Sequence, residues 1–386
     1  MRFRSTGNLG DVVATLESGS YTDRLSKRRW SLPEMDAAAA ALAGWFGERY
    51  DQGDRIGILG LNGADFMQTY LGVMRAGLVA VPINHKLPGE TVAYILADSQ
   101  CRAVFHHREF QSLLPSELSA FAFEDNAFSE ARKGEAAASV HPDKGVVAEI
   151  LYTSGSTGRP KGVPLDHHGQ LWALELFLDA IGDVPQKTII VAPTYHMNGL
   201  FFTTVALAKG WHTWSMPRFE ARVFLSLVDE ERISMLSGIP TMFAMMSRER
   251  DLIETLDLTS VTSVAIGSAP LTDALVETVQ FIFPNAAVTN SYGTTESGPA
   301  MFGPHPDGLS RPVTAIGYPY PGVELRLEDG GPDWGRLLTR TPATLSNYLN
   351  LPEVTAKKIT DGWYDTGDIV RRDSEGFYHF VGRADD

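Results

Sequence analysis

A loop of hydroxyl residues, glycines and one lysine is the part of this sequence best suited to chemistry. It occupies residues 151–163, LYTSGSTGRPKGV, where an apolar run opens into a polar one. Glycines let backbone N–H groups point inward at an anion, hydroxyl groups add donors, and lysine adds a cation. We predict that the loop binds a polyphosphate, because an ordinary polar turn needs fewer residues. The predicted phosphate-binding residues are Thr153, Ser154, Gly155, Ser156, Thr157, Gly158 and Lys161.

The order of residues in this loop differs from that of the P-loop nucleotide triphosphatases. Their motif places a lysine directly after its last glycine, and then a serine or threonine at the start of a helix. Here Gly158 is followed by Arg159, Pro160 and only then Lys161. Proline and glycine on the two sides of the lysine disfavour a helix start at that point. We therefore expect a loop that stays mobile over the phosphates.

Further short motifs follow the phosphate loop in a fixed order. They are GSAP at 267–270, NSYGTTE at 290–296, WYDTGD at 363–368 and GRADD at 382–386. Each turn by itself is weak evidence, since Gly-Asp and Asp-Asp pairs are common where strands end. Together with the loop, in this order, they resemble the adenylate-forming superfamily of CoA synthetases, peptide-synthetase adenylation domains and firefly luciferase. The resemblance covers nearly the whole chain and points to the large N-terminal domain of an acid-CoA ligase.

The resemblance assigns nucleotide contacts to the NSYGTTE segment. It implies that Asn290 meets the adenine edge, Tyr292 stacks on the adenine, Thr295 contacts the α-phosphate and Glu296 holds Mg²⁺. A carboxylate suits the last role, because Mg²⁺ prefers hard oxygen ligands. The other nucleotide-binding residues that it implies are Gly267, Ser268, Ala269, Pro270, Ser291, Gly293 and Thr294.

The resemblance also assigns the ribose site and a hinge. It implies that Asp368 accepts hydrogen bonds from both ribose hydroxyls, that Arg383 also reaches the ribose, and that Asp385 is the hinge. Residues 1–384 would then form the large domain and residues 385–386 the hinge, with the small C-terminal lid domain absent. A lysine of that lid acts on the α-phosphate in the family, so we expect this chain alone to catalyse the full reaction poorly.

The segment TYHMNGLFF at 194–202 resembles the part of acid-CoA ligases where a histidine lies beside the reacting carboxylate. His196 is the expected gate of the acyl pocket, although a histidine in such a place is often a core residue bonded to a backbone carbonyl. The segment lacks the aspartate with which amino-acid-activating relatives pair the substrate ammonium. Methionines adapt to irregular apolar shapes, so we expect an aromatic or medium aliphatic acid. The expected acyl-pocket residues are His196, Gly199, Met242 and Met301.

A two-step reaction follows from the resemblance. The acid attacks the α-phosphorus of ATP and expels pyrophosphate, and the CoA thiol then displaces AMP. The implied cofactors are ATP, Mg²⁺ and CoA as co-substrate, and the implied catalytic residues are His196, Thr295, Glu296 and Lys161. Catalysis of this kind depends mainly on positioning and charge neutralisation. Transfer of the acyl group to a carrier protein and a non-catalytic adenylate-binding domain remain alternatives.

Helical and strand-like periods alternate along the first half of the chain. Residues 32–50, 64–77 and 89–100 have helical spacing, and they are separated by short apolar runs typical of strands. This alternation predicts an α/β fold with helix-covered, mostly parallel sheet, and the resemblance implies two such sheets over residues 1–302. Short β-like runs between Gly and Pro predict a small β-barrel over residues 303–384. Residues 112–143 have weak periodicity and are interpreted as a surface connection.

Composition excludes several classes of protein. The formal net charge of −14 argues against a nucleic-acid partner, which needs a basic surface. The one cysteine, Cys101, cannot form an internal disulfide, and the first residues lack the apolar core of a secretion signal, so a cytoplasmic protein is expected. No apolar run approaches the roughly 20 residues of a membrane span. The expected partners are a small carboxylic acid, ATP and CoA, with a homodimer left open. The adjacent histidines at 106–107 and 167–168 are given no metal role, because neighbouring side chains point in different directions.

Overall fold

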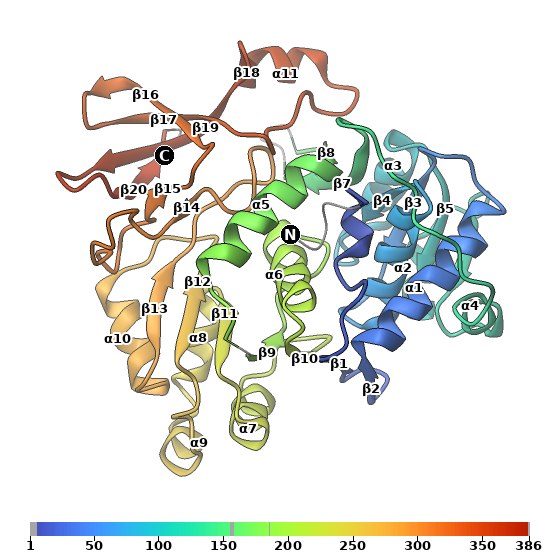
Figure 1. Cartoon of the computed structure of the whole chain (residues 1–386), viewed down its shortest axis with the longest axis horizontal. Coiled ribbons are helices and arrows are strands. Elements are labelled where there is room, and N and C mark those ends of the chain that lie inside the picture. Colours follow the sequence, from blue (N-terminus) through green and yellow to red (C-terminus); the bar gives the residue numbers. More distant parts are fainter. Residues whose placement is uncertain (1–5, 155–157, 185, 385–386) are drawn as a thin grey trace.

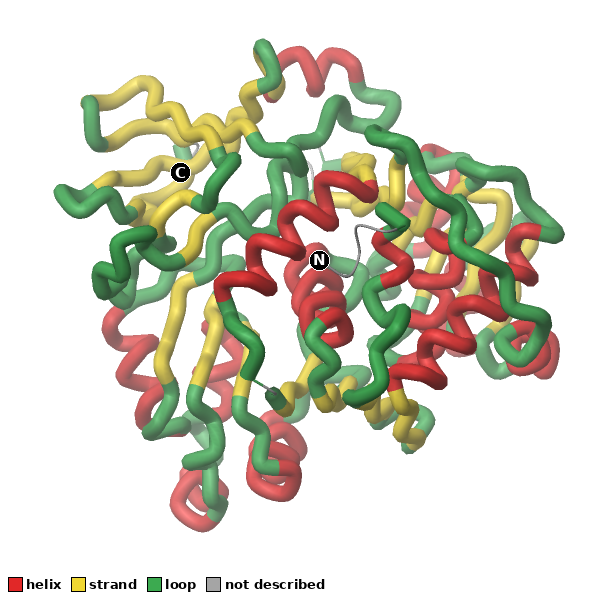
Figure 2. The backbone as a smooth tube through the Cα atoms, viewed as in Figure 1, coloured by secondary structure: helices red, strands yellow, loops and turns green. Residues whose placement is uncertain are grey.

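The computed structural model describes residues 6–154, 158–184 and 186–384. Three groups of elements follow one another in the chain. Figure 1 shows the first, in blue and teal, at the right, the second, in green to orange, at the centre and lower left, and the third, in red, at the top. In Figure 2 the first two groups combine strands with many helices, whereas the third consists mostly of strands. The proposed hinge Asp385 and the loop residues Gly155, Ser156 and Thr157 lie outside the described residues.

The first sheet is parallel except for its last strand. Its strands pair in the order β6-β5-β3-β4-β7-β8, and β8 runs antiparallel to β7. The bounds are β3 Arg55–Leu59, β4 Val79–Pro82, β5 Cys101–His106, β6 Ser119–Ala122, β7 Val147–Thr153 and β8 Lys161–Asp166. The accompanying helices are α1 Leu32–Gly47, α2 Ala64–Arg75, α3 Gly89–Asp98 and α4 Asn126–Ala131, with the short 3₁₀ helices η1 Leu9–Asp11 and η2 Arg108–Leu113.

Opposite faces of this sheet have separate cores. Alternate residues of a strand point to opposite faces. Ala80 of β4 accordingly packs with α1 and α2, whereas its neighbours Val79 and Val81 pack with α3 and η2. Because both faces are covered, the strands are apolar at nearly every position, as expected of a buried parallel sheet.

The second sheet is parallel except for its edge strand β2. Its order is β13-β12-β11-β9-β10-β1-β2, and β1 and β2 form an antiparallel hairpin. The bounds are β1 Ser20–Asp23, β2 Arg28–Ser31, β9 Lys187–Ile190, β10 His212–Ser215, β11 Met235–Gly238, β12 Ser263–Ile266 and β13 Ala287–Asn290. The helices of this part are α5 His167–Ala180, α6 Met197–Ala208, α7 Ala221–Glu231, α8 Pro240–Met246, α9 Arg250–Thr255 and α10 Asp273–Ile282.

Helices α5 and α6 share one apolar core with α1 and α2, so they lie where the two sheets meet (Figure 1). Helices α7, α8 and α10 cover the other face of the second sheet around a separate core. The two helix-covered, mostly parallel sheets confirm the expected α/β fold class. No helix in the described ranges combines the length and the apolar character that a bilayer-crossing segment needs.

The third group is antiparallel. Strands β16, β17, β19 and β18 pair in that order, and β20 pairs with the other side of β19. The bounds are β14 Phe302–Gly303, β15 Tyr318–Pro319, β16 Glu324–Gly331, β17 Trp334–Arg340, β18 Ile359–Thr360, β19 Trp363–Arg372, β20 Tyr378–Arg383 and helix α11 Pro352–Lys358. Short antiparallel strands thus occupy the part of the chain for which a small β-barrel was predicted.

Two segments contain more structure than the sequence indicated. Residues 112–143, interpreted as a surface connection, include β6 at the edge of the first sheet and α4 beside it. Apolar contacts hold this segment against the sheet. Phe121 packs against Phe105 with ring centroids 5.0 Å apart, and Phe128 is buried. The second segment is the hairpin of β1 and β2, which extends one edge of the second sheet beyond β10.

Candidate active site

A cavity of about 1000 Å³ lies at the carboxyl ends of the strands of the second sheet. Parallel α/β sheets bind their ligands at this edge, because the loops that follow the strands converge there. The loops after β9, β10, β11, β12 and β13 all contribute to its walls. The residues predicted from the sequence that line it are His196, Gly199, Met242, Gly267, Ser268, Ser291, Gly293, Thr294 and Thr295.

His196 is placed by the turn between β9 and α6. It is the residue that precedes the first turn of α6, and its ring lies edge-on to the ring of Tyr195 at 4.7 Å between centroids. Burial, reinforced by the positive charge of Lys86, lowers the pKa of His196 below its ordinary value. The ring is therefore neutral at neutral pH and would not form an ion pair with a carboxylate in the cavity.

Gly199 allows α6 to approach this turn. A Cβ at this position would lie 2.3 Å from the carbonyl oxygen of Pro193 and 2.5 Å from that of Ala192. Both are backbone atoms, which cannot move aside as a flexible side chain can. Glycine at 199 therefore sets how closely the start of α6, and with it His196, lies against the end of β9.

One wall of the cavity carries several apolar side chains. It includes Phe219, Met242 and Met245, and Met245 is about half exposed to the cavity side. One polar pair interrupts this wall: the side-chain amide of Asn198 donates to the hydroxyl of Ser268 at 3.3 Å. Such a wall accommodates an apolar acyl group.

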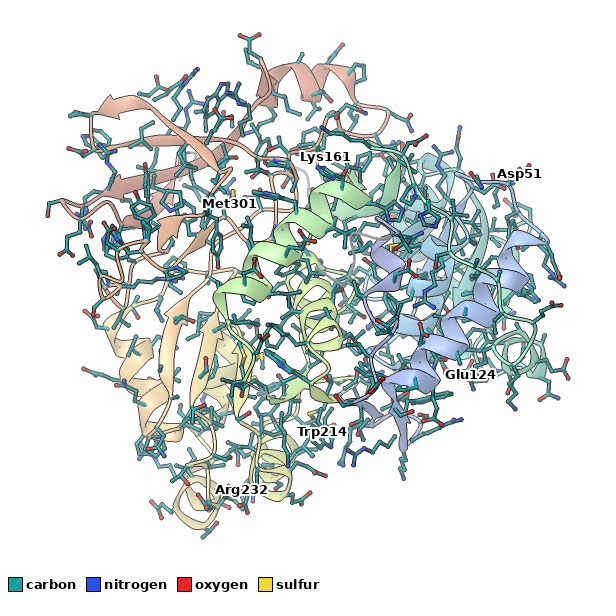
Figure 3. The ribbon with its side chains drawn as sticks, in the orientation of Figure 1. Asp51, Glu124, Lys161, Trp214, Arg232 and Met301 are labelled. Atoms are coloured by element: carbon teal, nitrogen blue, oxygen red, sulfur yellow. The ribbon has the colours of Figure 1, made fainter. Side chains whose placement is uncertain are left out.

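Met301 does not line this cavity, contrary to the expectation for the acyl pocket. It is fully buried and packs with Phe302, Leu337 and Val370 in the core of the antiparallel strands. Figure 3 labels Met301 among those strands, away from the lower-left sheet. Met301 closely follows the nucleotide motif in the sequence, but its side chain belongs to the core of the third group of strands.

The motif at 290–299 forms a tight turn after β13. The backbones of Thr294 and Gly298 exchange hydrogen bonds of 3.0 and 3.1 Å. A Cβ on Gly293 would lie 2.3 Å from the carbonyl oxygen of Pro299, so the turn closes only with glycine there. Ser291, Gly293, Thr294 and Thr295 of this turn line the cavity.

Glu296 and Lys161 approach the same aromatic ring. The hydroxyl of Tyr348 donates to Oε1 of Glu296 at 3.0 Å, and Nζ of Lys161 lies 5.0 Å from the centroid of the Tyr348 ring. Lys161 begins β8, opposite Thr153 at the end of β7, so no helix starts at the lysine. Figure 3 labels Lys161 near the start of α5. A cation of the phosphate loop and a carboxylate of the nucleotide motif therefore lie close together.

Glu296 can contribute to a magnesium site but cannot form one alone. In the part of the chain that the structure describes, there is no cluster of three or more histidine, cysteine or acidic side chains that could hold a metal. Mg²⁺ in nucleotide enzymes commonly takes one or two carboxylates, with waters and substrate phosphates as its other ligands. The donor set at Glu296 fits a metal that binds together with a polyphosphate.

The predicted ribose residues are joined in one network. Nη1 of Arg383 donates to Oδ1 of Asp368 at 2.8 Å, and the hydroxyl of Tyr292 donates to Oδ2. Burial raises the pKa of Asp368, against the opposing effects of Tyr292 and Arg383. Sequence reasoning placed Asp368 and Arg383 together but missed the link through the Tyr292 hydroxyl.

Some of the residues expected at the adenine do not line the large cavity. Asn290 and Pro270 line a neighbouring cavity of about 300 Å³, together with Thr314. The Asn290 side chain donates to the carbonyl oxygen of Thr314 at 3.0 Å, and Arg311 donates to the Asn290 carbonyl oxygen. Burial lowers the pKa of Arg311 to about 10, so it remains charged at neutral pH. Ala269 and Ser154 are exposed.

Comparison with known proteins identifies the family of this chain. The sequence matches the AMP-binding enzyme family over residues 12–349. Feruloyl-CoA synthase from an Amycolatopsis species is 28% identical over 346 residues, which cover 86% of this chain and 69% of that protein. The fatty acid–[acyl-carrier-protein] ligase ScoC of Streptomyces coeruleorubidus is 30% identical over 365 residues, covering 86% and 68%.

Solved structures with the same fold are known. The N-terminal domain of FACL13 from Mycobacterium tuberculosis superimposes with a TM-score of 0.85 at 25% identity, over 97% of this chain and 99% of that chain. ATP-bound MatB from Rhodopseudomonas palustris, at 24% identity, shares the fold with a TM-score of 0.86 over 99% and 79%. The fold is that of the N-terminal domain of adenylate-forming enzymes. The chain belongs to the AMP-binding enzyme family, which confirms the resemblance seen in its motifs.

Proposed function

We propose that this chain activates a carboxylic acid with ATP to an acyl-adenylate and transfers the acyl group to CoA. The observation that carries the proposal is the single cavity that joins the His196 wall to the turn at Thr295. An acid carboxylate beside His196 and an α-phosphate at Thr295 would share one space. Relatives of the chain include a feruloyl-CoA synthase, which by name forms a CoA thioester.

The first step makes the oxygen–phosphorus bond of an acyl-adenylate. A carboxylate oxygen attacks the α-phosphorus of ATP, and the bond to the pyrophosphate oxygen breaks. In the proposed arrangement Lys161 and the hydroxyls of the phosphate loop bind the leaving pyrophosphate, while Thr295 binds the α-phosphate. Mg²⁺, when bound through Glu296, supplies neutralisation of the phosphate charge. Asp368 and Arg383 hold the ribose, so the reacting atoms meet in a fixed geometry.

The apolar wall favours an aromatic or medium aliphatic acid. Phe219, Met242 and Met245 supply apolar surface on the acyl side of the cavity. The names of the relatives agree with both classes, since one is a feruloyl-CoA synthase and the other a fatty acid ligase. The second relative takes a carrier protein as its acceptor by name. A carrier-protein acceptor is therefore the second candidate, and acyl transfer to CoA against transfer to a carrier protein separates the two.

Stable acyl-sulfamoyl adenosine analogues test whether one cavity holds both halves of the acyl-adenylate. We expect an aromatic or medium-chain analogue to bind on the order of 10²-fold more tightly than AMP, because the second contact becomes intramolecular. Met245→Trp, which adds bulk at the acyl wall, should weaken binding of the analogue and leave AMP binding unchanged. Val223→Trp, on the partly exposed face of α7, is the matched control. If no analogue binds better than AMP, the acyl assignment of this cavity is wrong.

A further inference from the structure

The segment from Leu345 to Leu349 connects two parts of the proposed triphosphate site through its backbone. At one end the Leu345 N–H donates to the carbonyl oxygen of Glu296 at 2.7 Å. At the other end the Leu349 N–H donates to the carbonyl oxygen of Gly162, the residue after Lys161, at 2.9 Å. This short segment between β17 and α11 therefore joins the turn that carries Glu296 to the strand that carries Lys161.

Tyr348 repeats this connection with its side chain. Its hydroxyl donates to Oε1 of Glu296 at 3.0 Å, and its ring lies 5.0 Å below the ammonium nitrogen of Lys161. The face of an aromatic ring attracts a cation, and a hydrogen bond to a carboxylate fixes its orientation. One side chain therefore contacts the anion on one part of the site and the cation on the other.

The Tyr348 side chain is itself held firmly. It is 2% exposed, and its backbone N–H donates to the hydroxyl of Thr355 in α11 at 3.0 Å. A phenol carries its proton at neutral pH, so the Tyr348 hydroxyl is a donor to the carboxylate. Its position is therefore set by the protein before any nucleotide binds.

The two charges that Tyr348 contacts are not joined to each other by an ion pair among the described residues. Within the described ranges, neither Lys161 nor Glu296 forms an ion pair with another side chain of the protein. If they paired with each other, each would lose capacity to bind phosphate or metal. The ring lies beside the lysine ammonium, and the hydroxyl bonds Oε1 of the glutamate.

We propose that Tyr348 is a positioning residue that orients the Glu296 carboxylate toward Mg²⁺ and the Lys161 ammonium toward the phosphates of the same nucleotide. This inference rests on the proposed function, because it takes Glu296 as the metal ligand. It adds a residue that lies outside all the motifs named in the sequence. Its consequence is that metal binding and polyphosphate binding are coupled through one aromatic side chain.

Magnesium dependence of nucleotide binding tests the proposal on the whole chain. Tyr348→Phe keeps the ring and removes only the hydroxyl, so the Mg²⁺ concentration that gives half-maximal ATP binding should rise roughly tenfold, as expected for losing a hydrogen bond to a charged group. The affinity for AMP without metal should stay within about twofold, since AMP lacks the metal-bridged phosphates. Tyr348→Leu removes the ring as well and should further weaken ATP binding at saturating Mg²⁺.

The matched control is Tyr70→Phe. Tyr70 also donates its hydroxyl to a carboxylate, that of Glu149, at 3.1 Å, and lies on α2, outside the proposed site. This variant should leave the Mg²⁺ dependence unchanged. Thermal unfolding of each variant shows whether it is folded, and Tyr348→Phe alone decides the role of the hydroxyl.

Glu296→Gln separates the positioning role of Tyr348 from the metal-binding role of Glu296. A shifted Mg²⁺ dependence in Glu296→Gln with an unchanged one in Tyr348→Phe would overturn the positioning role and leave the metal role intact. No change in either variant would overturn the metal role itself. An equal loss of ATP and AMP binding in Tyr348→Phe would show that Tyr348 only supports the fold, which also overturns the inference.

Discussion

Asp368 lies in a network that is complete before any nucleotide binds. It is buried, and it accepts hydrogen bonds from Tyr292 and Arg383 on different oxygens. A carboxylate has about four lone-pair positions, so roughly two remain for the hydroxyls of a ribose. The proposed ribose site therefore needs little reorganisation. Single motifs in the sequence named Asp368 and Arg383, whereas the role of the Tyr292 hydroxyl depends on a contact between distant segments.

Glu149 gives a prediction about pH at the residue scale. It is fully buried on β7, and desolvation raises its pKa from 4.5 to about 7, with the hydroxyl of Tyr70 donating to it at 3.1 Å. Because its pKa is higher in the folded chain than in the unfolded chain, its contribution to stability is fully present below pH 4.5. That contribution is lost as the pH rises through about 7.

Glu149→Gln should therefore flatten the pH dependence of stability. Between pH 5 and pH 8 we expect the free energy of unfolding of the native chain to lose about 2 to 3 kcal/mol that the variant does not lose, because Gln does not titrate. Urea unfolding at the two pH values measures the difference. Glu117→Gln, an exposed position, is the control. The same pH dependence in the native chain and in Glu149→Gln would contradict the assignment.

At the scale of elements, the sequence predicted those with strong periods and missed those held by a few contacts. The expected helix at 32–50 is α1, whose Ser31 and Glu34 form a reciprocal capping box. The edge strand β6 was missed, although its alternation of alanine and phenylalanine at 120–123 is a period-two signal. The hairpin of β1 and β2 has no such signal, because it is held by pairing with β10.

Gly199→Ala tests how α6 positions His196. The added Cβ would lie 2.3 Å from a backbone oxygen, so the start of α6 must shift. We expect a loss of about 1 to 3 kcal/mol in the free energy of unfolding, as for overpacking elsewhere. Binding of the acyl-sulfamoyl adenosine analogue should fall more than binding of AMP, because the shift moves His196, which lines the same cavity.

Gly47→Ala is the control for this substitution. Gly47 lies at the exposed end of α1, and a Cβ there would have open space around it. Because alanine favours helix more than glycine does, this variant should be as stable as the native chain or slightly more stable. If Gly199→Ala behaves like Gly47→Ala in both stability and ligand binding, α6 does not set the acyl wall.

At the scale of the whole molecule, the first sheet helps to build the site on the second. Asn62 follows β3, and its side-chain amide donates to the carbonyl oxygens of Ala192 and Met216 at 3.0 and 3.3 Å. Its side-chain oxygen accepts the Thr194 N–H at 2.9 Å. A single buried side chain therefore ties together the loops after β9 and β10, which line the cavity.

Contacts of this kind mark the limit of what the sequence predicted. The family motifs singled out the turn at 290–296, the loop at 151–163 and His196 as candidates, because the residues of each motif are neighbours in the chain. Asn62 and Tyr348 were not found, since each acts across more than a hundred residues or between separate turns. Met301 was assigned to the wrong wall for the same reason: its neighbours in the chain did not show which core it enters.

Binding of Mg-ATP and of AMP, measured by calorimetry on the native chain and on Glu296→Gln, tests the central claim most directly. We expect the native chain to bind both ligands, and each at about 100 times its dissociation constant to add about 2.7 kcal/mol to the free energy of unfolding. Glu296→Gln keeps the shape of the side chain and removes its charge, so it should weaken Mg-ATP binding far more than AMP binding. Absence of heat and of thermal stabilisation with both ligands would contradict the nucleotide site, and equal losses for both ligands in Glu296→Gln would contradict its role at the metal.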